Sequence, residues 1–128
     1  MNACEDLQRA LITKWAATTA VGISLYYNRA NKDATVPYAV FYIDSTFERL
    51  FGGRIQPVTI QFNIFTATPS SESLNDYVEA VKTKFDTVKL TLAGGNTMMV
   101  PMMLESENIF INDTNHWQAT LIFSAKLR

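Results

Sequence analysis

The sequence contains one cysteine, Cys4, and one histidine, His116. A single cysteine cannot close an internal disulfide, so no disulfide framework exists and a reducing compartment is compatible. One residue of each type is also too few for a zinc site, which needs several such ligands. We therefore expect no bound metal and a fold that is held together by its hydrophobic core.

The sequence also has no large excess of charge of one sign and no long apolar run. The chain has 11 Lys and Arg against 12 Asp and Glu, for a formal net charge of -1. A global basic surface is thereby excluded, and we expect no specific binding of nucleic acid. No stretch approaches the roughly 18 to 20 apolar residues of a membrane span. The acidic start, Met1–Asp6, does not look like a secretory signal, so we expect folding in a cytoplasm and no membrane partner.

Apolar side chains, by contrast, are plentiful, at 48% of 128 residues. A chain of this length can bury a sizeable core without disulfides or a structural metal. We therefore expect a single domain over residues 1–128. The segment Val58–Thr66 alternates, with Val58, Ile60, Phe62 and Ile64 on one face, which predicts a half-buried strand. The preceding segment, Tyr38–Asp44, is apolar on both faces and predicts an inner strand.

The two segments are predicted to form a long hairpin that turns at Gly52-Gly53, because paired glycines supply the positive φ angles of a type I′ turn. That turn places Ile43 opposite Phe62 and Phe41 opposite Ile64. The end of the hairpin extends beyond what one small core covers. It is interpreted either as an ordinary solvated tip or as an arm that reaches a neighbouring subunit. The interface candidates are Phe47, Glu48, Arg49, Leu50, Phe51 and Arg54.

Helical spacing of apolar residues predicts one helix over residues 3–16 and a second that ends near Phe85. The other predicted elements are a strand that includes Val21–Tyr27, a small hairpin over Lys89–Val100 that turns at Gly94-Gly95, a short strand over Glu105–Asn112, a turn at Asp113–His116 and a final strand over 117–128. This order predicts an α+β fold, with an antiparallel or mixed sheet and both helices on one face.

No enzyme constellation stands out. His116 is predicted in a polar turn, and Glu105 and Glu107 are predicted at a solvated strand edge rather than in a cleft. Four methionines, Met98, Met99, Met102 and Met103, are interpreted as core filling, with an adaptable contact surface as the alternative. We expect neither catalysis nor a cofactor.

Three stretches, VPYAVFYID, QFNIFTATPSSESLNDYVEAV and HWQATLIFSAKLR, occur in an order that resembles the tail terminator or tail completion proteins of long-tailed bacteriophages and prophages. The resemblance covers roughly residues 7–127. It implies a structural virion protein that forms a ring, usually a hexamer, at the head-proximal end of the tail. That ring would stop growth of the tail tube and permit head joining. Its implied partners are other copies of itself, the tube protein and head-tail connector proteins.

Three other hypotheses remain open at this stage. The first is a head-tail connector, or neck, subunit, which shares this size and layout. The second is a small ligand-binding domain with a closed apolar pocket, for example beneath Tyr26, Tyr27, Tyr38 and Tyr42. The third is an enzyme whose site forms between subunits, which would require His116 or the two glutamates in a cleft.

Overall fold

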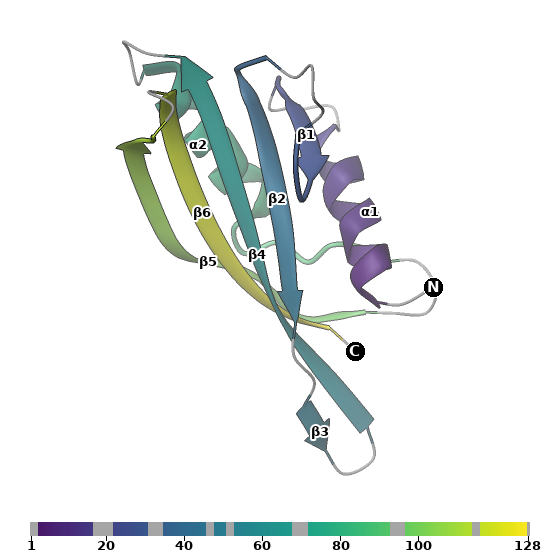
Figure 1. The fold of residues 1–128 in the computed structure, drawn as a ribbon. Helices are drawn as coiled ribbons and strands as arrows, with labels where there is room; N and C mark the ends of the chain where they lie inside the picture. Colours follow the sequence, from purple (N-terminus) through teal and green to yellow (C-terminus); the bar gives the residue numbers. More distant parts are fainter. Residues whose placement is uncertain are drawn as a thin grey trace.

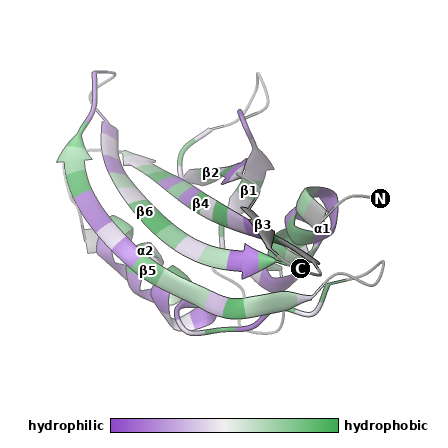
Figure 2. Ribbon diagram, turned by 90° about the horizontal axis from the view of Figure 1, so that it is seen from below, coloured by the Kyte–Doolittle hydropathy of each residue, from purple (hydrophilic) through white to green (hydrophobic). Residues whose placement is uncertain are grey.

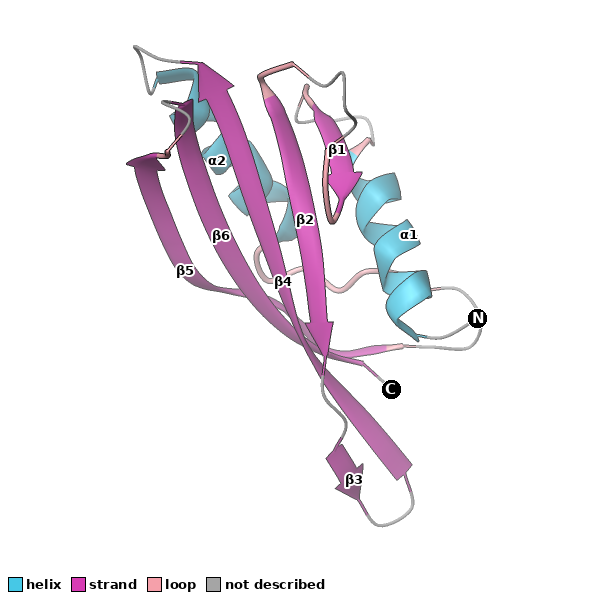
Figure 3. Cartoon of the chain, viewed as in Figure 1, coloured by secondary structure: helices cyan, strands magenta, loops and turns pink. Residues whose placement is uncertain are grey.

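The computed structural model describes residues 3–16, 22–30, 35–45, 48–50, 53–67, 72–92, 97–113 and 116–127. Along the chain one helix is followed by four strands, and a second helix by two more strands, as Figures 1 and 3 show. The elements are α1 (Ala3–Trp15), β1 (Ser24–Tyr27), β2 (Tyr38–Ser45), β3 (Glu48–Leu50), β4 (Gly53–Ala67), α2 (Glu72–Phe85), β5 (Met98–Ile111) and β6 (His116–Leu127).

Five strands form one mixed sheet in the order β1-β2-β4-β6-β5, and β3 pairs only with β4. The β2–β4, β4–β6 and β5–β6 pairs are antiparallel, whereas β1 runs parallel to β2. The predicted α+β class is confirmed. β4, the longest strand, lies at the centre of this order with β6 beside it, and Figure 2 shows hydrophobic and hydrophilic residues alternating along both.

The core lies between one face of this sheet and both helices. The alternating residues of β4 (Val58, Ile60, Phe62 and Ile64) are all buried, as their period of two predicts. The ring of Phe62 stacks with Trp15 of α1 at 5.6 Å and with Phe85 of α2 at 5.2 Å. Because one phenylalanine contacts both helices, the two helices pack on the same face, as predicted.

The two helices are also joined by a buried lysine. Lys84 of α2 is 6% exposed, and its Nζ donates hydrogen bonds to the main-chain oxygens of Lys14, at 2.8 Å, and Trp15, at 3.3 Å. These oxygens lie in the last turn of α1, where carbonyls lack helical partners and a cation is favoured. Burial, and then the nearby charge of Lys14, lower the pKa of Lys84 below 10.5.

The predicted hairpin register is wrong by two residues. Ile43 lies opposite Ile60, not Phe62, and Phe41 lies opposite Phe62, not Ile64. Gly53 is not a turn residue, because it belongs to β4 and pairs with Leu50. The alternating pattern specifies only which face each residue takes, and a shift of two residues preserves every face. The faces were therefore predictable, whereas the partners were not.

Two predictions about the C-terminal half are also wrong. Residues 89–92 form no strand, so the hairpin predicted over Lys89–Val100 is not formed there; its Gly94-Gly95 turn lies outside the described residues. The short strand predicted at Glu105 instead begins at Met98, because β5 accommodates Pro101. Proline lacks an N–H group, which is tolerated in an edge strand such as β5. His116 is the first residue of β6 rather than part of a turn.

Candidate interaction surface

The hairpin of β3 and β4 projects beyond the sheet. β4 has paired neighbours on both sides only as far as Val58 on the β2 side and Gln56 on the β6 side. Beyond Gln56, β4 pairs with β3 alone, and Figure 1 shows this two-stranded ribbon extending below the rest of the molecule. A two-stranded ribbon is marginally stable in water without further packing. The projecting ribbon is therefore suited to contact another molecule.

The base of this ribbon is attached to the start of α1. Gln56 Nε2 donates a hydrogen bond to Cys4 Sγ at 3.1 Å, and Cys4 Sγ donates to Ser45 Oγ at 3.6 Å. Cys4 therefore bridges the last residue of β2 and the residue at which β4 leaves the sheet. The direction of the ribbon is fixed at its root by these contacts and by the continuous strand β4.

The structure positions four of the six predicted interface residues. Glu48, Arg49 and Leu50 form β3, and Arg54 lies directly opposite Arg49. Phe47 and Phe51 lie outside the described residues. Sequence inspection alone did not reveal the arginine pair, because it depends on the register.

The sheet face opposite the helices carries a polar network across the central strands. Asn63 Oδ1 accepts hydrogen bonds from Gln61 at 3.2 Å and from Thr120 at 2.9 Å. Gln118 in turn donates to Thr120 at 3.4 Å and accepts from Asn112 at 3.2 Å. Asn63 is only 6% exposed, although no helix covers this face. The network consists of side-chain amides and the hydroxyl of Thr120, groups that donate and accept hydrogen bonds.

The four tyrosines predicted around an apolar pocket are divided between the two faces of the sheet. Tyr26 and Tyr38 contact each other edge to face at 6.1 Å and lie opposite the helices, where they line an open depression. Tyr27 instead packs against Phe41 of the core at 5.0 Å. Tyr42 is 38% exposed. The four rings therefore do not enclose one pocket.

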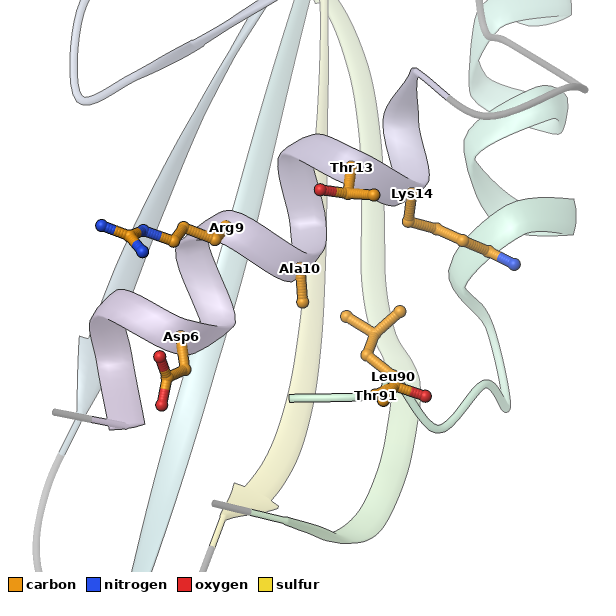
Figure 4. Close-up of a pocket in the computed structure, with 7 residues that line it drawn as sticks. All are labelled: Asp6, Arg9, Ala10, Thr13, Lys14, Leu90 and Thr91. Carbon is orange, nitrogen blue, oxygen red and sulfur yellow. The ribbon is translucent and has the colours of Figure 1, made fainter. Parts of the chain in front are cut away.

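A separate groove lies beside α1. Its lining residues are Asp6, Arg9, Ala10, Thr13, Lys14, Leu90 and Thr91. Figure 4 shows Ala10 and Leu90 facing each other across it, while the cationic ends of Arg9 and Lys14 extend away to opposite sides. The groove thus has a mainly apolar wall without convergent reactive groups, which is weak support for a catalytic site.

The remaining candidates for acid-base chemistry are not brought together. Glu105 accepts a 2.6 Å hydrogen bond from Ser124, whereas Glu107 forms a 3.0 Å ion pair with Lys82 of α2. The two carboxylates thus have partners on opposite faces of the sheet. The hydrogen bond from Lys82 to Glu107 is the main reason that the pKa of Lys82 is raised. The main-chain N–H of His116 donates to Asn112 Oδ1 at 3.1 Å.

Among the described residues no cluster of three or more potential metal ligands is found. The same part of the chain has no helix that combines the length and apolarity needed to cross a membrane. The methionines divide between both interpretations, since Met98 and Met102 are buried in the core while Met99 and Met103 are exposed.

Comparison with solved structures finds chains of similar fold that match over nearly the whole length of this one. A chain in the virion of a native gene transfer agent particle matches with a TM-score of 0.82 at 13% identity, over 97% of this chain and 96% of that one. A second solved chain matches with a TM-score of 0.63 at 14% identity, over 98% and 92%. No protein-family model and no curated protein matches the sequence. At these identities the likeness defines the class of fold that the chain shares.

Proposed function

We propose that this chain is a structural virion protein, specifically a tail terminator or tail completion subunit. The observation that carries the proposal is the likeness of the complete fold to a chain in a virion, over 97% of one and 96% of the other. The independent sequence resemblance to tail terminators supports the same class. In this role the subunit forms a ring at the head-proximal end of the tail, ends growth of the tube and permits head joining.

The projecting ribbon supports assembly by a heterologous contact, in which one surface of a subunit binds a different surface of the next. Such contacts generate closed rings when the rotation between subunits closes. β3 and the end of β4 extend away from the body, and among the described residues they pair only with each other, as an arm of this kind requires. The proposal includes neither a catalytic step nor a cofactor, and its partners are further copies, the tube protein and connector proteins.

Electron microscopy of particles from a producing host, with the gene intact or deleted, tests the proposal. Deletion is expected to yield tails of uncontrolled length that do not join heads. Tails of normal length that fail to join heads would favour the connector role instead. Particles indistinguishable from those of the intact host would contradict both roles.

A complementation control separates an assembly role from effects on neighbouring genes. The intact gene supplied in trans is expected to restore tail length and head joining. A second complementing gene carries the core change Phe62→Asp, which places a charge where the rings of Trp15 and Phe85 pack. That gene is expected to fail, because an unpaired buried charge unfolds the chain.

A further inference from the structure

The ribbon continues the pairing of β2 with β4 in one register. Ser45 lies opposite Val58, and Glu48 lies opposite Ile55, so β3 follows β2 along the same side of β4. On the other side of β4, the pairing with β6 ends at Gln56. In the described part of the chain, β4 therefore continues beyond Gln56 with a neighbour on one side only.

The direction of the main-chain groups along β4 follows from one hydrogen bond. The N–H of Asn28 donates to the oxygen of Phe41 at 2.9 Å, so the main-chain groups of Phe41 face β1 and not β4. Phe62, the β4 partner of Phe41, therefore directs its own main-chain groups toward β6. These directions alternate along a strand, and the register is unbroken from Phe62 to Val58. The main-chain nitrogen of Pro57 consequently points to the side on which β2 and β3 lie.

Pro57 interrupts the hydrogen bonds on that side of β4. Proline has no N–H group, so β4 offers no donor to the β2–β3 side at this residue. Gln56 directs its main-chain groups to the opposite side, and the neighbouring donors toward β2 and β3 are Thr59 and Ile55. The missing donor thus lies where the ribbon leaves the sheet. Main-chain hydrogen bonds fix the direction of the ribbon less firmly there than they fix the rest of β4.

Side-chain contacts are present at the same point. Gln56 Nε2 donates to Cys4 Sγ at 3.1 Å, and Cys4 Sγ donates to Ser45 Oγ at 3.6 Å. Cys4 belongs to α1, which is held on the sheet by the fully buried side chains of Leu7 and Leu11. The root of the ribbon is thereby connected to a helix that is fixed in the core. A thiol is a weak donor and acceptor, so these contacts separate at a small cost.

We propose that Gln56, Cys4 and Ser45 form a releasable latch. In the free subunit this latch sets the direction of the ribbon, because Pro57 interrupts the main-chain hydrogen bonds at the ribbon's root. Release of the latch lets the ribbon change its angle to the sheet while β4 stays continuous. A subunit that joins a ring then fits its arm to a neighbour without unfolding a strand. The use of the arm rests on the proposed function, whereas the latch itself is a property of the isolated chain.

NMR of the isolated chain tests the latch. Order parameters from residual dipolar couplings report how far the ribbon amides (residues 48–50 and 53–55) move relative to the sheet amides (residues 60–64). Gln56→Leu removes the donor to Cys4, and the ribbon order parameters are expected to fall by at least about 0.2, close to the difference between rigid and flexible backbone. Cys4→Ala should cause the same fall, and the two changes together should cause no more. The matched control is Thr59→Leu, at an exposed position of the same strand, which should leave the values unchanged.

Pro57→Val separates the latch from the missing main-chain donor. Valine supplies the N–H that proline lacks and is well suited to a strand. In this background Gln56→Leu is expected to have little further effect, because a main-chain hydrogen bond then holds the ribbon. An equal fall in both backgrounds overturns the proposal, and so does the absence of a fall with both Gln56→Leu and Cys4→Ala. Unchanged amide chemical shifts over residues 60–64 show in each variant that the sheet is intact.

Failure of the latch is distinguishable from failure of the proposed function. The NMR comparison uses the isolated chain, so its result does not depend on whether the chain belongs to a tail. Normal particles from the deleted host would contradict the function and leave the latch standing. Ribbon order parameters that do not respond to either substitution would contradict the latch and leave the function standing.

Discussion

The ammonium group of Lys84 donates a 2.8 Å hydrogen bond to the main-chain oxygen of Lys14, so α2 supplies the C-terminal cap of α1. The two residues are far apart in the sequence, and each belongs to a helix that packs on the same sheet face. A surface lysine at the end of a helix would contribute little. This lysine is almost fully buried, so the loss of its contacts leaves carbonyl oxygens without partners.

Replacement of Lys84 by methionine is expected to lower the free energy of unfolding by about 1–3 kcal/mol, the cost of leaving buried acceptors unsatisfied. Urea unfolding monitored by circular dichroism measures the change. The matched control is Lys89→Met, at an exposed position after the same helix, which should change stability by no more than about 0.5 kcal/mol. A Lys84→Met protein as stable as the original would show that the cap contributes no net stability.

Lys84 also predicts a pH dependence. Its pKa in the folded chain is lowered below 10.5, so between the folded pKa and 10.5 the unfolded chain binds more protons than the folded one. The free energy of unfolding therefore rises with pH through that window, and below it the cost of the buried charge is present in full. Relative to Lys84→Met, the original protein should gain stability as pH approaches 10.5. A flat or falling difference across that range would contradict the prediction.

The polar network on the uncovered sheet face is expected to stabilise the fold. Asn63→Ala removes the oxygen that accepts from Gln61 and Thr120, and should cost about 1–3 kcal/mol. Thr59→Ala, at an exposed position of the same strand, should change stability by no more than about 0.5 kcal/mol. Thermal and urea unfolding of both proteins provide the comparison. Equal values would show that the hydrogen bonds on this face merely replace those to water.

Hydrogen exchange should distinguish the ribbon from the strand that continues it. In the isolated chain, backbone amides of β3 are expected to exchange much faster than those of residues 60–64, because β3 has one paired neighbour and residues 60–64 have two. In an assembled ring the β3 amides should become protected. Slow exchange of β3 in the monomer would indicate that the ribbon is already packed, and the proposed arm would be wrong.

The sequence was most informative where a periodic pattern determines burial. The stripe of Leu7, Leu11 and Trp15 on α1 and the alternation of β4 were both predictable, because one face of each element must leave water. The direction of each strand and the residues with which it pairs were not predictable in this way. The parallel orientation of β1 and the pairing of Gly53 with Leu50 depend on contacts between segments, and local residue patterns do not encode these.

The candidate interaction surface was likewise predictable only in part. The projecting hairpin was predictable, since its strands are longer than the core needs. The contacts of Asp86, Thr87 and Val88 with β5 were not predictable, because they join two segments that local residue patterns do not relate. The short strand predicted at Glu105 also left out the first part of β5, which begins at Met98.

The continuity of β4 from the core into the ribbon has a mechanical consequence. Hydrogen bonds between antiparallel strands run perpendicular to the strand axis. A pull on the ribbon along β4 therefore loads the β2–β4 and β4–β6 ladders in shear, with all of their bonds sharing the force at once rather than opening one by one. Tension passed from one subunit to the next would be carried by the longest strand of the fold, and not by a loop.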